Sequence, residues 1–122
     1  MTMMREIRGE MAYHAGLSAE KQIARHYMSC GYKLLEERWR GSGGEVDLIL
    51  ANSQRVVFVE VKKARDMATA ASRVTTAQLR RIFASAEEYL FNMTNPPDEA
   101  RIDAALVDAT GACDVIENAY YA

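Results

Sequence analysis

The chain has 122 residues, of which 49% are hydrophobic and 26% charged, and its formal net charge is −2 at pH 7. This length allows one domain with a modest core, and the composition is ordinary for a soluble globular protein. No apolar run approaches the roughly 18 residues of a membrane span, and the N-terminus lacks the apolar segment of a secretory signal. Its two cysteines have no metal-binding spacing, and because we see no export signal, we expect a cytoplasmic protein with reduced thiols.

We expect residues 1–15 to be a poorly ordered N-terminal extension and residues 16–122 to form a single domain. The first helix is predicted at residues 18–30, with Ser18 as its N-cap. Glu20 falls beside the apolar stripe of this helix. Its carboxylate either interacts with the positive end of the helix or points, as a third acid, toward a site elsewhere in the domain.

The next segments predict three strands. Residues 32–39 form the first, and the glycines after them predict a flexible turn. Two further strands occupy residues 44–62, where β-branched and aliphatic residues dominate and residues 52–54 supply a turn. The small residues that follow show no periodicity, which predicts a mobile loop.

A second helix is predicted at residues 76–92, and two final strands at residues 101–109 and 113–120. The coarse order of elements is therefore α-β-β-β-α-β-β. This order predicts an α+β fold with a mixed β-sheet flanked by helices.

Charged residues interrupt the otherwise apolar strands at Asp47, Glu60 and Lys62. Burying an unpaired charge is costly, so charges inside core strands usually have a partner or a metal ion. Glu60 and Lys62 are two residues apart, and they therefore project from the same face of their strand. The sequence thus predicts a charged site on one face of the sheet.

The turn predicts which residues face each other across the two strands. A two-residue loop pairs Asn52 with Arg55, and the same register places Asp47 beside Glu60, about 5 Å apart at Cβ. Ser-Gln is a poor type I′ turn, so a one-residue slip or a bulge is the alternative.

Two adjacent carboxylates repel each other, so either one takes up a proton or a cation lies between them. Oxygen ligands alone suit Mg²⁺ or Mn²⁺ better than zinc. Lys62 would hold an attacking water or stabilise charge on a phosphate. Together these groups predict the hydrolysis of a phosphodiester.

Basic residues gather around the predicted site. Residues 38–81 contain nine basic and four acidic side chains, whereas residues 82–122 contain one basic and eight acidic side chains. A bound phosphate backbone would need such a basic region. The alternative is a solvated charged surface without a ligand.

The order Asp47, then Glu60-Val61-Lys62, resembles the D…(D/E)xK signature of the PD-(D/E)xK nuclease superfamily. The wider sequence pattern, GEVDLI followed by VFVEVK, resembles the small, uncharacterised YraN-type family of bacteria. Members of that family are similar to archaeal Holliday-junction resolvases. The resemblance extends from residue 16 to residue 107. It implies a restriction-endonuclease-like αβββαβ core of the α/β three-layer type.

The resemblance also implies roles for individual residues. Asp47, Glu60 and the main-chain carbonyl of Val61 would hold Mg²⁺ or Mn²⁺, and Lys62 would act beside them in catalysis. In the segment GLSAEKQIA, Glu20 matches the acid of the family's first helix, which contributes to the metal site in related nucleases.

Four residues are expected to contact the substrate: Arg40, Arg73, Gln78 and Arg80. Arg40 matches the arginine of the family's Asn-x-Arg motif, whose asparagine is absent here. The family has a lysine where this chain has Gln78, which either hydrogen-bonds the substrate or is an inert residue on the helix face. Arg101-Ile102-Asp103 resembles the family's Arg-Phe-Asp, so we expect Asp103 to pair with Arg101 and to orient neighbouring groups.

Three functions are compatible with these observations. The first is a Mg²⁺- or Mn²⁺-dependent endonuclease, a hydrolase acting on DNA; the resolvases imply branched or otherwise structured DNA and a homodimer. The second is a catalytically inactive nucleic-acid-binding module, which the pI of about 5.7 and the missing lysine favour. The third is a protein-interaction domain that uses the acidic C-terminal third.

Overall fold

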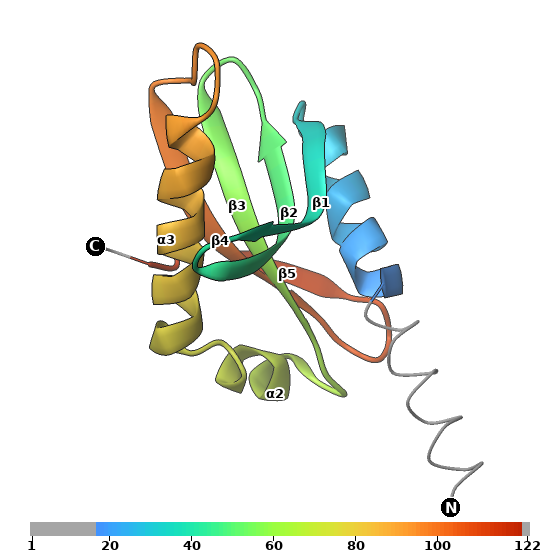
Figure 1. Ribbon diagram of the computed structural model, residues 1–122. Coiled ribbons are helices and arrows are strands. Elements are labelled where there is room, and N and C mark those ends of the chain that lie inside the picture. The colour runs from blue at the N-terminus through green and yellow to red at the C-terminus, as the bar shows by residue number, and fades with distance from the viewer. Residues whose placement is uncertain (1–16, 121–122) are drawn as a thin grey trace, which may run out of the picture.

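The structure is a computed structural model that describes residues 17–120 (Figure 1). The elements within this range are a helix at residues 17–29, called the N-terminal helix here, β1 (Lys33–Gly41), β2 (Gly44–Ala51), β3 (Arg55–Lys63), α2 (Met67–Ser72), α3 (Thr76–Phe91), β4 (Glu99–Val107) and β5 (Cys113–Ile116). The predicted extension at residues 1–15 lies outside the described residues. Within residues 17–120, no helix has the length and hydropathy required to cross a bilayer.

The five strands form one sheet in the order β1-β2-β3-β4-β5. Neighbouring strands are antiparallel except β3 and β4, which are parallel and are joined by a crossover through α2 and α3. The N-terminal helix covers one face of the sheet and α3 covers the other (Figure 1). This arrangement confirms the predicted α+β fold and the αβββαβ order of its core; α2 and β5 are additions to that core.

Strands β2 and β3 are apolar on both faces because a helix covers each face. Leu48 and Val59 pack with the N-terminal helix, whereas Ile49 and Phe58 pack with α3. Each of these side chains is fully buried or nearly so, and such burial stabilises the fold by about 1.5–3 kcal/mol per side chain. The two central strands therefore supply the rigid support on which the charged residues stand.

Asp103 of β4 is fully buried and joins the N-terminal helix to the sheet. Its carboxylate accepts hydrogen bonds from the Tyr27 hydroxyl at 2.6 Å, from the Arg101 guanidinium at 2.8 and 2.9 Å, and from the Asn118 main-chain N–H at 3.0 Å. Burial, together with the hydrogen bond to Asp103, raises the pKa of Tyr27, so its hydroxyl remains a donor. The predicted Arg101–Asp103 pair and the orienting role of Asp103 are confirmed.

Helix α2 occupies part of the segment that was predicted to be a mobile loop, and that prediction is wrong. Asp66 caps the helix, since its Oδ1 accepts a hydrogen bond from Thr69 N at 2.7 Å. Ala70 is fully buried and packs with Ala64 and Leu106. Small residues let this short helix lie close to the sheet, and they also conceal the hydrophobic periodicity that would have predicted it.

Some predicted boundaries also differ. Ser18 lies inside the N-terminal helix, because residue 17 is already helical, so its predicted role as N-cap is wrong. Strand β4 spans Glu99–Val107 rather than residues 101–109, because its parallel pairing with β3 starts at Glu99. Strand β5 ends at Ile116 rather than at residue 120, because a turn follows in which Asn118 adopts a φ of +53°.

The turn between β1 and β2 packs directly against α3, rather than standing free as the predicted flexible turn. Ser85 Oγ of α3 donates a hydrogen bond to the Gly44 carbonyl at 2.9 Å. A Cβ atom at Gly43 would overlap the main-chain carbonyl of Arg81, so the close approach of the turn requires glycine at this position.

We predict that Gly43→Ala destabilises the protein by about 1–3 kcal/mol, because the added methyl group must push the turn away from α3. Urea denaturation measures this change in the free energy of unfolding. Ser42→Ala is the matched control, since it keeps the hydrogen bond from the Ser42 main-chain N–H to Glu88 at 2.7 Å. Equal stability of the Gly43→Ala protein and the wild type would contradict the close approach.

Candidate active site

The predicted register of β2 and β3 is confirmed. The observed pairs run from Ala51↔Val56 to Leu48↔Val59, and the Asn52 main-chain N–H donates to the Arg55 carbonyl at 3.0 Å. The slipped register is therefore excluded. Asp47 and Glu60 are the next residues of β2 and β3 beyond the last pair, and the charge of Glu60 raises the pKa of Asp47.

The pairing of β2 with β3 ends at Leu48 and Val59, and Asp47 occupies the point where the strands separate. Asp47 Oδ2 accepts a hydrogen bond from the Val61 main-chain N–H at 2.8 Å. In a continued antiparallel ladder, that N–H would bond to a main-chain carbonyl of β2. The carboxylate has taken its place, so Asp47 is held against β3 by the backbone itself.

The surroundings of Asp47 raise the pKa of its carboxyl group from 3.8 to about 7. The largest cause is burial, which penalises the charged form, and the negative charge of Glu60 adds to it. The hydrogen bond from Val61 acts in the opposite direction, while Glu20 and Glu45 contribute further repulsion. Near neutral pH and without a cation, Asp47 is therefore partly protonated.

Glu60 and Lys62 project from the same face of β3, as their spacing predicts. Lys62 Nζ lies 3.0 Å from Glu60 Oε1, and their side chains are only 21% and 12% exposed. This ion pair is therefore largely removed from water, and each charge depends on the other.

Glu20 comes to the same region from the N-terminal helix. Its side chain is 16% exposed, and Oε1 lies 3.1 Å from Arg38 Nη1. Burial raises the pKa of Glu20, whereas the hydrogen bond from Arg38 lowers it. The charge of Glu20 also contributes to the raised pKa of Asp47.

Arg38 reaches Glu20 because the backbone of β1 departs from regular strand geometry. Glu36, two residues earlier, accepts a hydrogen bond from Tyr89 of α3 at 3.3 Å, so regular alternation would also point Arg38 toward α3. Arg38 instead adopts a φ of +47° and pairs with the helix on the opposite face. The sequence carries no signal for this conformation, and Arg38 was not predicted as a site residue.

The candidate metal ligands at this site are oxygen donors. No group of three or more His, Cys, Asp or Glu side chains in residues 17–120 is placed to hold a metal ion. A metal ion would therefore draw on Asp47, Glu60 and the Val61 carbonyl, with water completing the shell, as Mg²⁺ prefers. The repulsion between Glu60 and Asp47 is what a bound dication would relieve.

A polar pocket opens beside Glu60. Its lining comes from the β1–β2 turn, the end of β3 and the first turns of α3: Gly43, Gly44, Glu45, Glu60, Gln78, Arg81 and Ile82. Gln78 is thus the one predicted substrate residue in the described lining of this pocket. Arg81, which was not predicted, is also there; its spacing of three residues from Gln78 on one helix face is the signal that could have identified it.

The other predicted substrate residues do not line this pocket. Arg40 is exposed, and its guanidinium lies 3.6 Å from the carboxylate of Glu45, which does line the pocket. Arg73 is exposed at the end of α2 and donates to the Lys63 carbonyl at 3.1 Å. Arg80 is exposed on α3.

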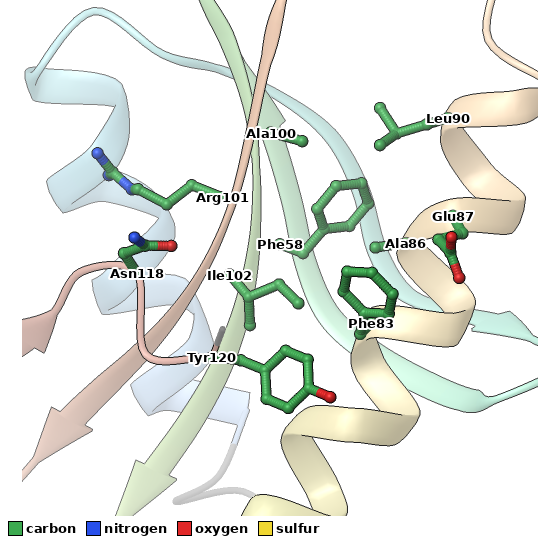
Figure 2. A pocket seen from close by; sticks show the side chains of 10 residues that line it. All are labelled: Phe58, Phe83, Ala86, Glu87, Leu90, Ala100, Arg101, Ile102, Asn118 and Tyr120. Carbon is green, nitrogen blue, oxygen red and sulfur yellow. The ribbon is translucent and has the colours of Figure 1, made fainter. Parts of the chain in front are cut away.

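A second pocket lies between α3 and β4 and has a different character. Figure 2 shows that aromatic and aliphatic side chains dominate it, among them Phe58, Phe83, Ile102 and Tyr120. The Phe83 and Tyr120 rings lie 5.5 Å apart. Glu60 lines the polar pocket and not this one, so we associate the candidate site with the polar pocket.

The raised pKa of Asp47 predicts how stability depends on pH. Between about pH 4 and pH 7 the folded protein keeps a proton that the unfolded chain has released. The free energy of unfolding therefore falls as pH rises through this window, by up to about 1.4 kcal/mol per pH unit from this group. Asp47→Asn keeps an oxygen for the Val61 N–H and removes the titration, so this variant gains stability relative to the wild type from pH 5 to pH 7.

Urea denaturation of both proteins at pH 5, 6 and 7 measures this difference, and the comparison cancels every titration that the two proteins share. A stability difference that stays constant with pH would show that Asp47 has an ordinary pKa.

Comparison with known proteins identifies the family. Residues 19–107 match the sequence profile of the uncharacterised protein family UPF0102. A UPF0102 protein of Roseobacter denitrificans is 50% identical over 115 residues, covering 91% of this chain and 87% of the relative. Relatives from Cereibacter sphaeroides and Ruegeria pomeroyi are each 44% identical; both alignments cover 93% of this chain, and they cover 98% and 93% of the relatives. The chain belongs to the UPF0102 family, the YraN-like family that its motifs resemble.

Proposed function

We propose that this protein is a metal-dependent endonuclease of the PD-(D/E)xK superfamily that hydrolyses phosphodiester bonds in DNA. One observation carries the proposal: Asp47 accepts the Val61 main-chain N–H where β2 and β3 separate, and the Glu60–Lys62 ion pair lies on the same stretch of β3, with Glu60 lining a polar pocket. The αβββαβ order of the core agrees with the resemblance of these motifs to that superfamily. Branched or otherwise structured DNA is the substrate class that the resemblance to resolvases favours.

Each residue of the site has a separate task. Asp47, Glu60 and the Val61 carbonyl hold Mg²⁺ or Mn²⁺, with Glu20 as a further acid nearby. When bound, such an ion supplies Lewis-acid polarisation of water and phosphate. Lys62 donates hydrogen bonds that orient a water molecule or stabilise charge developing on the phosphate.

The basic residues around the site bind the substrate. Arg81 lines the pocket with Glu60, and its guanidinium would bind a phosphate held near the carboxylates. Three further arginines extend this basic region: Arg40, Arg73 and Arg80. They explain how a protein with a net charge of −2 can bind a polyanion, since the positive charge is concentrated where the phosphates lie.

A nucleic-acid-binding module without catalysis is the second candidate. It is favoured by the described residues of the site, which offer no third close His, Cys, Asp or Glu ligand. In such a module, the Glu60–Lys62 and Glu20–Arg38 ion pairs would persist in the complex with DNA.

The proposal predicts metal-dependent cleavage that requires Asp47 and Lys62. Labelled four-way junction, flap, single-stranded and duplex DNA are incubated with Mg²⁺, Mn²⁺ or EDTA. Asp47→Ala and Lys62→Ala should each reduce cleavage by at least about 100-fold, because each removes a group that acts on the reacting phosphate. Asp114→Asn, an exposed acid on β5, is the matched control and should cleave normally.

Wild-type protein that binds the junction without cutting it in either metal would support the binding module. A protein that neither cuts nor binds DNA would exclude both candidates.

Arg81 and Arg80 allow a matched comparison of substrate binding. Because Arg81 lines the pocket with Glu60, Arg81→Ala should weaken DNA binding about 3- to 10-fold. It should also reduce the slope of log binding constant against log salt concentration by about one. Arg80→Ala removes the same charge from an exposed position and should have a smaller effect. Fluorescence anisotropy in Ca²⁺ at several salt concentrations measures both variants, and equal losses would show that the pocket does not hold a phosphate.

A further inference from the structure

Gln78 occupies a position in which its side chain can act on Lys62. It is the third residue of α3, after the N-cap Thr75, whose Oγ1 accepts the Gln78 main-chain N–H at 3.1 Å. Its side chain is half-buried and lines the pocket beside Glu60. The Gln78 main-chain N–H thus serves the helix cap, and in one amide orientation its side chain also accepts the Thr75 main-chain N–H in a long capping-box bond of 3.4 Å.

The two ends of a glutamine amide are assigned from their hydrogen-bond partners. In one orientation, Nε2 faces the Lys62 ammonium and Oε1 faces the Arg73 carbonyl, so donor meets donor and acceptor meets acceptor; Oε1 gains only a long bond of 3.4 Å from Thr75 N. In the other orientation, Oε1 accepts from Lys62 Nζ at 3.0 Å and Nε2 donates to the Arg73 carbonyl at 3.0 Å. Two short, complementary bonds favour the second orientation.

Lys62 is consequently held by two acceptors of different character. Glu60 Oε1 is anionic and lies 3.0 Å from Nζ, while Gln78 Oε1 is neutral and lies at the same distance. An ammonium group has three N–H donors, so one remains for water or a phosphate oxygen. The carbonyl of Arg73 fixes the far end of the Gln78 amide to the backbone, so the acceptor has a defined place.

We propose that Gln78 is a positioning residue that keeps Lys62 directed at the site when Glu60 turns to a metal ion. This inference rests on the proposed function. A carboxylate whose oxygens coordinate a cation has less negative charge to offer an ammonium group. Gln78 then retains Lys62 through an acceptor that is neutral and therefore does not compete for the metal ion.

The test detects the Lys62 ammonium directly. In protein labelled with ¹⁵N-lysine, a hydrogen-bonded ammonium exchanges slowly enough with water to give its own NMR signal, and Lys62→Arg assigns that signal by removing it. The signal should be present in the wild type with and without Mg²⁺. Gln78→Met, which is similar in shape but has no strong acceptor, should broaden or lose it in Mg²⁺, and Gln78→Glu should restore it.

Thr75→Ala is the matched control. It removes the hydroxyl that caps α3 and leaves the Gln78 amide in place, so it reproduces a loss of helix stability without the loss of the acceptor. The Lys62 signal should survive in this variant. Gln78→Ala provides a second truncation if Gln78→Met does not fold, and circular dichroism establishes the folding of each variant.

Cleavage kinetics give a second readout. Gln78→Met should lower kcat about 10-fold with little change in KM, because Lys62 acts on the reacting phosphate rather than on distant parts of the substrate. A Lys62 signal that is unchanged in Gln78→Met and Gln78→Ala, or equally lost in Thr75→Ala, would overturn the role of Gln78. These NMR outcomes do not depend on activity, so they remain distinct from a failure of the wild type to cleave DNA.

Discussion

The separation of β2 and β3 beyond Leu48 and Val59 is the feature on which the site depends. It frees the Val61 N–H from the ladder, and the Asp47 carboxylate accepts that N–H in place of a main-chain carbonyl. The carboxylate is therefore fixed at the edge of the apolar core, where burial raises its pKa. Two strands that are apolar on both faces keep this gap open, since helices hold them from either side.

Two ion pairs stand near this gap. Lys62 balances Glu60 from the same strand, and Arg38 of β1 balances Glu20 of the N-terminal helix. These pairs lower the cost of holding Glu20, Glu60 and Lys62 largely out of water, and that cost would otherwise oppose folding. Under the proposed function, a dication or a phosphate would replace one partner of a pair while the other remains in place. The ion pairs would then stabilise the metal-free protein without blocking a ligand.

Much of this arrangement follows from local rules in the sequence. The pairing of Asn52 with Arg55 fixes the register, and the spacing of Glu60 and Lys62 fixes their common face, so both were predictable. Other features depend on contacts between distant segments. The left-handed backbone of Arg38 and the packing of Ala70 in α2 have no local pattern that predicts them. The fold was therefore more predictable than the details of the site.

The strand pairings around the site differ in how far apart their residues lie in the sequence. The carboxylates lie on a local hairpin, in which Leu48 and Val59 pair across a short stretch of chain, whereas Phe58 pairs with Ile102 only after the crossover through α2 and α3 is complete. Closing the longer loop costs more chain entropy, and such contacts slow folding. Asp47 and Glu60 thus lie on a hairpin, whereas Gln78 and Arg81 lie on α3 in the crossover between β3 and β4. A chain interrupted before β4 could pair the hairpin strands yet lack the parallel partner of β3.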